Sequence, residues 1–108
     1  HHAGFDFGFL RPAAESAGIH LEPLSLDTML LSAVLETHPE ARHGLDYVCE
    51  RYGVEVFGRH TALGDALATA EVLVRMIPQL AERGIVTLGQ AREAMARTEL
   101  AKRIEAGA

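Results

Sequence analysis

The sequence predicts a mainly α-helical chain with at most one short strand. Apolar residues recur at helical spacing in several segments, capping residues precede some of these segments, and glycine or proline follows them. The chain has 108 residues, 48% of them hydrophobic and 23% charged, which is typical of one small globular domain. No internal repeat and no low-complexity linker divides the sequence.

The first two predicted helices span residues 5–17 and 28–35. Apolar side chains occupy every fourth position of the first helix, and Pro12 should kink it or divide it. Residues 24–27 fit either a strand or a helix, because the apolar run there is short. Asp27 can then cap the second helix, since its side-chain oxygens can accept hydrogen bonds from the free N–H groups.

Two further helices follow, a short one over residues 45–52 and a long one that starts near residue 63. Gly53 should stop the short helix, and the long helix should end near Pro78 or shortly beyond. The apolar positions of the short helix are Leu45, Val48, Cys49 and Tyr52. The predicted apolar stripe of the long helix is Leu63, Ala66, Leu67, Ala70, Leu73, Val74 and Ile77.

A terminal helix should begin after Thr87. Thr87 and Gln90 have the spacing of a capping box, in which each side chain accepts from a free backbone N–H at the helix start. The helix should run to about Glu105, with a shallow, alanine-rich apolar face that packs at the periphery or against a partner. The prediction is therefore four or five helices in all.

Charge and cysteine content narrow the classes of function. A net charge of −5 argues against a broad electrostatic surface for duplex DNA, which normally needs an excess of Lys and Arg. It does not exclude nucleic acid at an acidic metal site, where divalent cations meet the phosphate. Cys49 is the single cysteine, so a reducing cytoplasm is consistent with the sequence. No membrane span or signal peptide is expected.

Asp6 and the segment from Arg59 to Ala66 carry the informative side chains. Each alone has a common structural explanation. An Asp at a helix start complements the helix dipole, and a lone His before a helix is more often a surface residue than a base. Gly64 lies beside Asp65, and Gly inside a helix costs roughly 1 kcal/mol relative to Ala, so its presence suggests close approach by backbone or ligand.

Taken together, these residues resemble the second and third motifs of the DnaQ-like (DNA polymerase III epsilon-like, DEDDh) exonucleases. Residues 1–10, HHAGFDFGFL, look like the second motif, which usually reads His-Asn-Ala-x-Phe-Asp. Residues 60–70, HTALGDALATA, match the third motif. Residues 26–31 and 45–53 are similar to the segments between the motifs. The resemblance covers roughly residues 1–80 in order and spacing, which makes it far more specific than a single motif.

The resemblance implies that this chain is the mainly helical C-terminal half of an α/β, ribonuclease H-like domain. Residues 1–84 would be the C-terminal part of the exonuclease domain and residues 85–108 a helical extension. Asp6 and Asp65 would help to hold two Mg²⁺ or Mn²⁺ ions, and His60 would be the general base that deprotonates the attacking water. The implied substrate is a single-stranded or frayed 3′ end of nucleic acid, with DNA as the first expectation.

The chain departs from the family pattern in two places. The family's first motif, Asp-x-Glu, would precede His1 and would supply two further carboxylates, so we expect this chain alone to be inactive as a nuclease. His2 stands where the family usually has Asn, and an appended residue, a natural variant and an altered fragment all fit the sequence there.

We also expect a homo-oligomer. In the family, the first and the long helix would bury apolar side chains against a sheet that lies mostly outside this sequence, and exposed apolar surface favours association. The side chains expected to lack partners are Phe5, Phe9, Leu67 and Val74. The alternative function is a non-catalytic helical interaction or oligomerisation module derived from an exonuclease.

Several other polar residues have simpler explanations. Three histidines lie in loop-like polar contexts without the paired spacing of a zinc site, and we expect them at the surface. Three arginines fit weak contacts to a nucleic-acid backbone, although a solvated face or an ion pair is the commoner role. These residues are His20, His38, His43, Arg42, Arg51 and Arg59.

Overall fold

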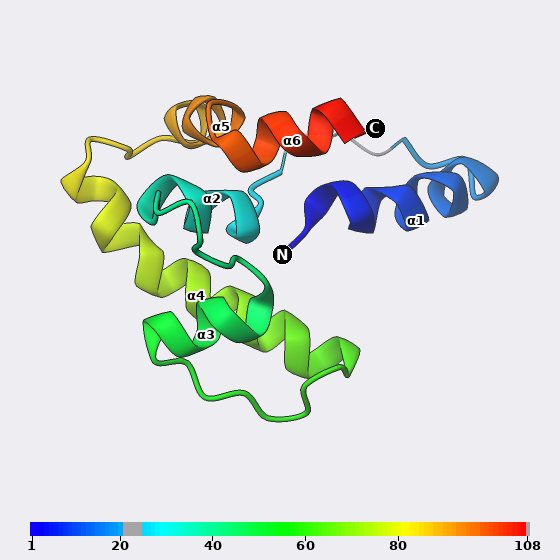
Figure 1. Ribbon diagram of the computed structural model, residues 1–108. Coiled ribbons are helices and arrows are strands. Elements are labelled where there is room, and N and C mark those ends of the chain that lie inside the picture. Colours follow the sequence, from blue (N-terminus) through cyan, green and yellow to red (C-terminus); the bar gives the residue numbers. More distant parts are fainter. Residues whose placement is uncertain (21–24, 108) are drawn as a thin grey trace.

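The computed structural model describes residues 1–20 and 25–107, and this part of the chain contains six helices and no strand (Figure 1). The helices are α1 (Ala3–Ser16), α2 (Thr28–Leu35), α3 (Leu45–Tyr52), α4 (Ala62–Glu82), α5 (Leu88–Ala96) and α6 (Glu99–Gly107). The mainly α prediction is confirmed. Residues 25–27 form neither helix nor strand, and Leu24 lies outside the described residues.

The core surrounds α2, which packs against α3, α4, α5 and α6. Two neighbouring side chains of α2, Leu31 and Ser32, are completely buried. The core side chains are Leu31, Leu45, Val48, Cys49, Val54, Ala68, Val72, Met76, Leu80, Ala91 and Met95. Their removal from water, at roughly 25 cal/mol per Å² of apolar area, is the main stabilising contribution to this helical body.

The long helix α4 buries a different face from the predicted one. Its buried side chains recur at every fourth residue and are Gly64, Ala68, Val72, Met76 and Leu80. In the predicted stripe only Leu73 is half-buried, whereas Leu63, Leu67, Val74 and Ile77 are exposed. Both faces of α4 are apolar, so periodicity alone could not choose between them. The small Gly64 and Ala68 allow the closer approach, and that face meets the core.

The predicted helix boundaries are largely confirmed. Asp27 caps α2, accepting from the N–H groups of Met29 and Leu30, and the C-cap Gly53 has a positive φ of 68°. Thr87 forms the predicted capping box at the start of α5. Pro12 lies inside α1 and does not divide it.

The predicted terminal helix is in fact two helices. Thr98 interrupts it, because its hydroxyl oxygen accepts from the Ala101 N–H at 3.0 Å and so caps a new helix, α6. The peripheral position expected for this segment is wrong for α5, whose Ala91 and Met95 belong to the core. The boundary between two units at residue 84 stays a prediction.

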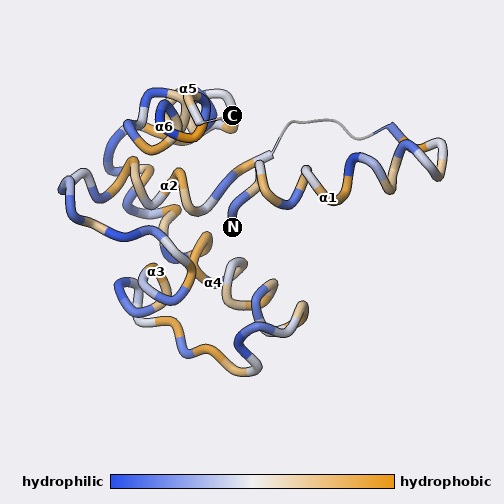
Figure 2. The backbone as a smooth tube through the Cα atoms, turned by 45° about the vertical axis from the view of Figure 1, so that its right-hand side comes forward, coloured by the Kyte–Doolittle hydropathy of each residue, from blue (hydrophilic) through white to orange (hydrophobic). Residues whose placement is uncertain are grey.

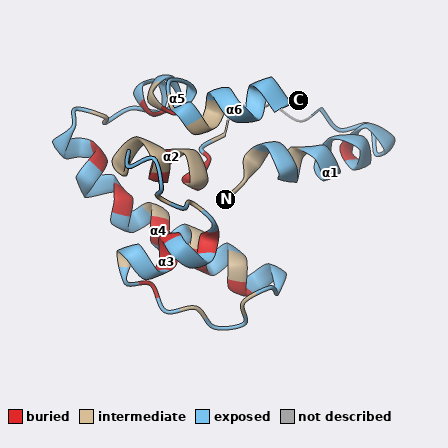
Figure 3. Ribbon diagram, viewed as in Figure 1, coloured by how far each residue is buried: buried red, intermediate tan, exposed pale blue. Residues whose placement is uncertain are grey.

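The first helix stands apart from the core. Among the described residues α1 packs against no other helix, and Figures 1 and 2 show it projecting from the body with apolar residues along it. The rings of Phe5 and Phe9 contact each other edge to face, with centroids 5.1 Å apart, yet are 61% and 70% exposed. Figure 3 shows that most of α1 is exposed, whereas buried residues recur along α4. None of the helices in the described ranges has the length and hydropathy that a bilayer-spanning segment requires.

Candidate functional site

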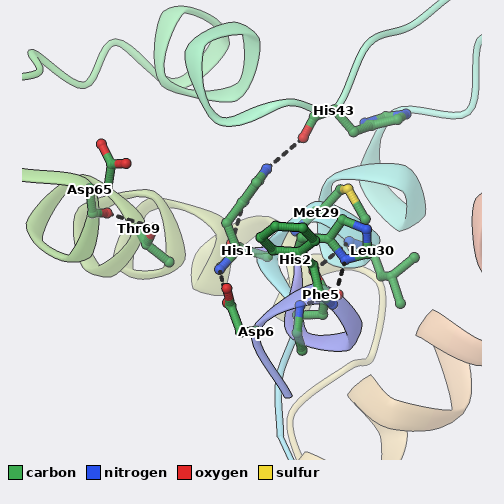
Figure 4. A network of polar contacts seen from close by, with 12 residues as sticks. His1, His2, Phe5, Asp6, Met29, Leu30, His43, Asp65 and Thr69 are labelled. Carbon is green, nitrogen blue, oxygen red and sulfur yellow. Dashed lines mark hydrogen bonds and ion pairs between the residues drawn. The ribbon is translucent and has the colours of Figure 1, made fainter. Parts of the chain in front are cut away.

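The residues before α1 are attached to the body through the imidazole of His1. Its Nε2 lies 2.6 Å from the carbonyl oxygen of His43, and its Nδ1 lies 2.6 Å from the Thr28 hydroxyl (Figure 4). A carbonyl oxygen only accepts, so Nε2 carries a proton, and in the neutral ring Nδ1 accepts from the Thr28 hydroxyl. This side chain therefore connects the start of α1 with α2 and with the loop that precedes α3.

The buried carboxylate of Asp27 joins the starts of two helices. One oxygen accepts from the Met29 N–H at 2.9 Å, as the N-cap of α2, and the other accepts from the Ala3 N–H at 3.0 Å. Ala3 is the first residue of α1, so one side chain satisfies free N–H groups of both helices. Asp27 therefore fixes the start of α1 relative to the core, and with it the position of Asp6.

Asp6 lies in the first turn of α1, where the helix dipole favours a negative charge. Its side chain is more than half exposed, and one oxygen lies 3.8 Å from the amino group of His1. Figure 4 shows Asp6 beside His1, with Asp65 on a different helix and its carboxylate turned away from Asp6.

A tight loop places His60 and Asp65 at the start of α4. The Thr61 hydroxyl donates to the Gly58 carbonyl and accepts from the Gly64 N–H at 3.0 Å. At Gly64, an added Cβ would lie 2.1 Å from the Gly58 carbonyl oxygen, a distance that no real side chain tolerates. The predicted close approach is thus confirmed, and its partner is the backbone of residues 57–58.

His60 adopts a left-handed backbone conformation, with φ 73°, which is uncommon for a residue other than Gly. Its backbone N–H donates to one oxygen of Asp65 at 3.0 Å, and its exposed ring has Nδ1 3.4 Å from a guanidinium nitrogen of Arg59. The loop thus brings His60, the predicted base, next to Asp65, the predicted ligand of the third motif. The contact between them is made by the backbone N–H of His60 and not by its ring.

Both oxygens of Asp65 are engaged. Oδ1 accepts from the His60 N–H, and Oδ2 lies 2.8 Å from Nη1 of Arg59. The His60 N–H and the Arg59 guanidinium hold the pKa of the Asp65 carboxyl below its ordinary value. Arg59 also donates through Nε to Asp46 of α3 at 2.5 Å, so it bridges two carboxylates.

The predicted metal ligands fit a metal by chemistry but not by arrangement. Carboxylate oxygens are the ligands that Mg²⁺ and Mn²⁺ prefer. Within the described ranges, however, no group of three or more His, Cys, Asp or Glu side chains could hold a metal ion. Asp6 and Asp65 come from helices that do not pack together, and Arg59 contacts Asp65. The roles assigned to Asp6, His60 and Asp65 therefore stay predictions.

Three features of this region could not be predicted from the sequence. An ion pair was one of the commoner roles expected for Arg59, but no local pattern indicates its partner 13 residues earlier. The Ala3 contact of Asp27 is likewise long-range, although its cap on α2 was predictable. His43 was expected at the surface but is half-buried, with Nδ1 2.7 Å from the Ser32 hydroxyl. Burial, together with the charge of Arg51, lowers the pKa of His43.

Two cavities lie away from the three predicted site residues. One, of about 600 Å³, lies between α2, the loop after it, α5 and α6, and its lining includes His43, Arg97 and Arg103. The other, of about 330 Å³, lies between α2, α4 and α5 and is mostly apolar. Neither is lined by Asp6, His60 or Asp65.

Comparison with known proteins gives two kinds of match. Residues 1–73 match the family model RNase_T, described as exonuclease. The chain is 44% identical over 91 residues to a DNA polymerase III subunit epsilon-like protein of Rhodobacter capsulatus, an alignment that covers 82% of this chain and 13% of that protein. It is 31% identical over 104 residues to the PolC-type DNA polymerase III of Staphylococcus aureus, covering 95% of this chain and 7% of that protein.

The chain thus spans only a small part of the length of these relatives. No solved structure matches it.

The close packing at Gly64 leads to a stability prediction. Gly64→Ala should lower the free energy of unfolding by about 1–3 kcal/mol, because a Cβ would push the backbone of residues 57–58 away from α4. Urea denaturation followed by circular dichroism measures this change. Gly89→Ala in α5 is the matched control: its Cβ would meet nothing within 4 Å, so the better helix former should stabilise by up to about 1 kcal/mol. Equal effects of the two substitutions would contradict the packing argument.

Proposed function

The chain belongs to the exonuclease family that the RNase_T model describes, and we propose that it is part of a metal-dependent 3′ to 5′ exonuclease that hydrolyses terminal phosphodiester bonds of DNA. The observation that carries the proposal is the family match over residues 1–73, which includes both motif segments. The relatives named as DNA polymerase III proteins support DNA as the substrate. In this proposal the protein acts in the cytoplasm and contacts a single-stranded or frayed 3′ end of its DNA substrate.

In this proposal Asp6 and Asp65 are the residues of this chain that would hold divalent cations, Mg²⁺ or Mn²⁺. Such cations stabilise the negative charge that phosphodiester hydrolysis creates on the attacking and leaving oxygens. His60 is the proposed general base. Its ring is exposed to solvent, and a neutral imidazole can accept a proton from water near neutral pH. His60 has a left-handed backbone, and its N–H donates to Asp65 in the first turn of α4.

We expect residues 1–108 alone to show no Mg²⁺- or Mn²⁺-dependent degradation of single-stranded DNA, because the two motifs present supply only part of the carboxylates that the family resemblance implies. The assay uses DNA labelled at its 5′ end, so that shortening from the 3′ end is visible as a ladder. Robust degradation that disappears in the His60→Ala variant would overturn this expectation.

A longer form that carries an Asp-x-Glu segment before His1 tests the ligand assignment. In that form Asp65→Asn should reduce the rate by several orders of magnitude while the helical content stays unchanged, since a charged cation ligand is lost at a partly exposed position. The matched control is Glu71→Gln, which removes the same charge from an exposed position of α4 and should leave the rate unchanged. A near-normal rate in a well-folded Asp65→Asn variant would rule out the assignment.

The alternative function is a non-catalytic interaction or oligomerisation module, and the apolar side chains exposed on α1 and α4 favour it. Phe5 and Phe9 of α1 are exposed to solvent, and so are Leu67 and Val74 of α4, which are 58% and 66% exposed. Apolar area of this extent favours association with another surface.

We therefore expect this chain to form a homodimer or a higher oligomer through these side chains. Phe9→Lys should reduce the molar mass measured by light scattering at tens of micromolar, because it places a charge in the proposed interface. Val86→Lys, at an equally exposed position between α4 and α5, should leave the molar mass unchanged. A compact wild-type monomer at this concentration would refute the association.

A further inference from the structure

The larger of the two cavities, of about 600 Å³, is lined by both charged and apolar side chains. It lies where α5 and α6 meet α2 and the loop of residues 36–43, and Figure 1 shows α5 and α6 above α2. Small-molecule sites in proteins typically have volumes of about 300–1,000 Å³. Among the described residues, the lining of the 330 Å³ cavity contains no charged or histidine side chain. The larger cavity is therefore the one equipped for recognition of a polar ligand.

Hydrogen bonds fix the position of the proton on His43, which lines this cavity. Nη1 of Arg51 donates to the hydroxyl oxygen of Ser32 at 2.7 Å, and this oxygen lies 2.7 Å from Nδ1 of His43. Ser32 is completely buried, and the described residues offer its proton no other acceptor, so the hydroxyl donates to Nδ1. The neutral imidazole therefore carries its proton on Nε2. Burial, together with the charge of Arg51, lowers the pKa of His43 and so keeps the ring neutral near neutral pH.

Two donors at the cavity wall are free for a ligand. The Nε2–H group of His43 has no hydrogen-bond partner in the part of the chain that the structure describes. Arg103 of α6 also lines the cavity, and it forms no hydrogen bond or ion pair with another described residue. After burial and Arg51, the charge of Arg103 also lowers the pKa of His43, so the two groups are close enough to interact. One acceptor group can therefore meet both of them.

The two carboxylates of the lining already have partners. Oε1 of Glu36 accepts from a backbone N–H two residues later at 3.0 Å, and Oε1 of Glu99 lies 3.5 Å from Nζ of Lys102. Arg97, the second arginine of the lining, contacts only Glu93 of its own helix, with 3.9 Å between Nη2 and the carboxylate, among the described residues. The unused groups of the cavity are thus mainly donors with positive charge, and they favour an anionic ligand.

We propose that this cavity binds a small organic anion, whose phosphate or carboxylate group accepts from Arg103 and from the Nε2–H of His43. Guanidinium and imidazole N–H groups bind both kinds of acid group. The apolar or aromatic body of the ligand lies against the apolar part of the lining, which includes Ala33, Val34, Pro39 and Ala94. The site is separate from the three predicted site residues, so it goes beyond the proposed function and does not depend on it.

The test is a titration of the 108-residue chain with two anions and their neutral counterparts, followed by the backbone amide signals in ¹⁵N–¹H spectra. Deoxyadenosine 5′-monophosphate is compared with deoxyadenosine, and phenylacetate with phenylacetamide. At least one anion should shift the amides of the cavity lining in a saturable manner, and should bind about tenfold more tightly than its neutral counterpart, since hydrogen bonds to charged groups contribute that much. The anion that binds more tightly identifies the acid group as phosphate or carboxylate.

Three variants locate the binding. Arg103→Gln should weaken the anion about tenfold without loss of helical content, because the side chain is exposed and loses only its charge-assisted contact with the ligand. Arg92→Gln is the matched control, since this exposed arginine of α5 does not line the cavity, and it should bind as the wild type does. Ala94→Leu keeps every charge but fills part of the cavity, and it should lower the affinity several-fold.

Several outcomes would overturn the proposal. Neither anion binding at millimolar concentration, or both binding no more tightly than their neutral counterparts, would show that the cavity is no anion site. Equal weakening by Arg103→Gln and Arg92→Gln would show that the anion responds to the overall charge and not to this cavity. An unchanged affinity of Ala94→Leu would place the ligand outside the cavity. The exonuclease assignment is unaffected by all of these results, because its predicted residues do not line the cavity.

Discussion

The buried carboxylate of Asp27 is the contact through which the projecting first helix is positioned on the rest of the protein. A buried carboxylate must be satisfied by hydrogen bonds, and here it accepts from N–H groups at the starts of both α1 and α2. Because α1 packs against no other described helix, its direction depends on this contact and on His1, whose imidazole and backbone carbonyl both bind to the body. The place of Asp6 is thus set by polar contacts and not by an apolar interface.

The third-motif segment, residues 60–70, is positioned by different contacts. Gly64 lets the backbone of residues 57–58 lie directly against α4, and the Thr61 hydroxyl closes the loop between them. This packing places the N–H of His60 on the Asp65 carboxylate and brings Arg59 to its other oxygen. The two motif segments therefore have independent supports, which explains why their carboxylates do not form one cluster among the described residues.

Local signals in the sequence predicted local structure well. Asp27, Gly53 and the Thr87–Gln90 pair were recognisable caps, because a cap depends on a few residues around one helix end. The buried face of α4 was not predictable, since its opposite faces are both apolar and the choice depends on which one meets α2 and α3. The identities of Asp6, His60 and Asp65 as candidates came from motif spacing, whereas the contact between Arg59 and Asp65 required the folded loop.

The exposed apolar side chains and the site carboxylates lie on the same two helices, and this links association to electrostatics. Phe5 neighbours Asp6 in the first turn of α1, whereas Leu63 and Leu67 lie two residues before and after Asp65 and therefore on the opposite side of α4. A surface that covers Phe5 would also exclude water near Asp6. Lower solvent screening strengthens every charge interaction there, and it raises the cost of a carboxylate that has no positive partner. In such a covered state Asp6 would need a positive partner more than it does in solvent, whereas Asp65 on the other helix already has one in Arg59.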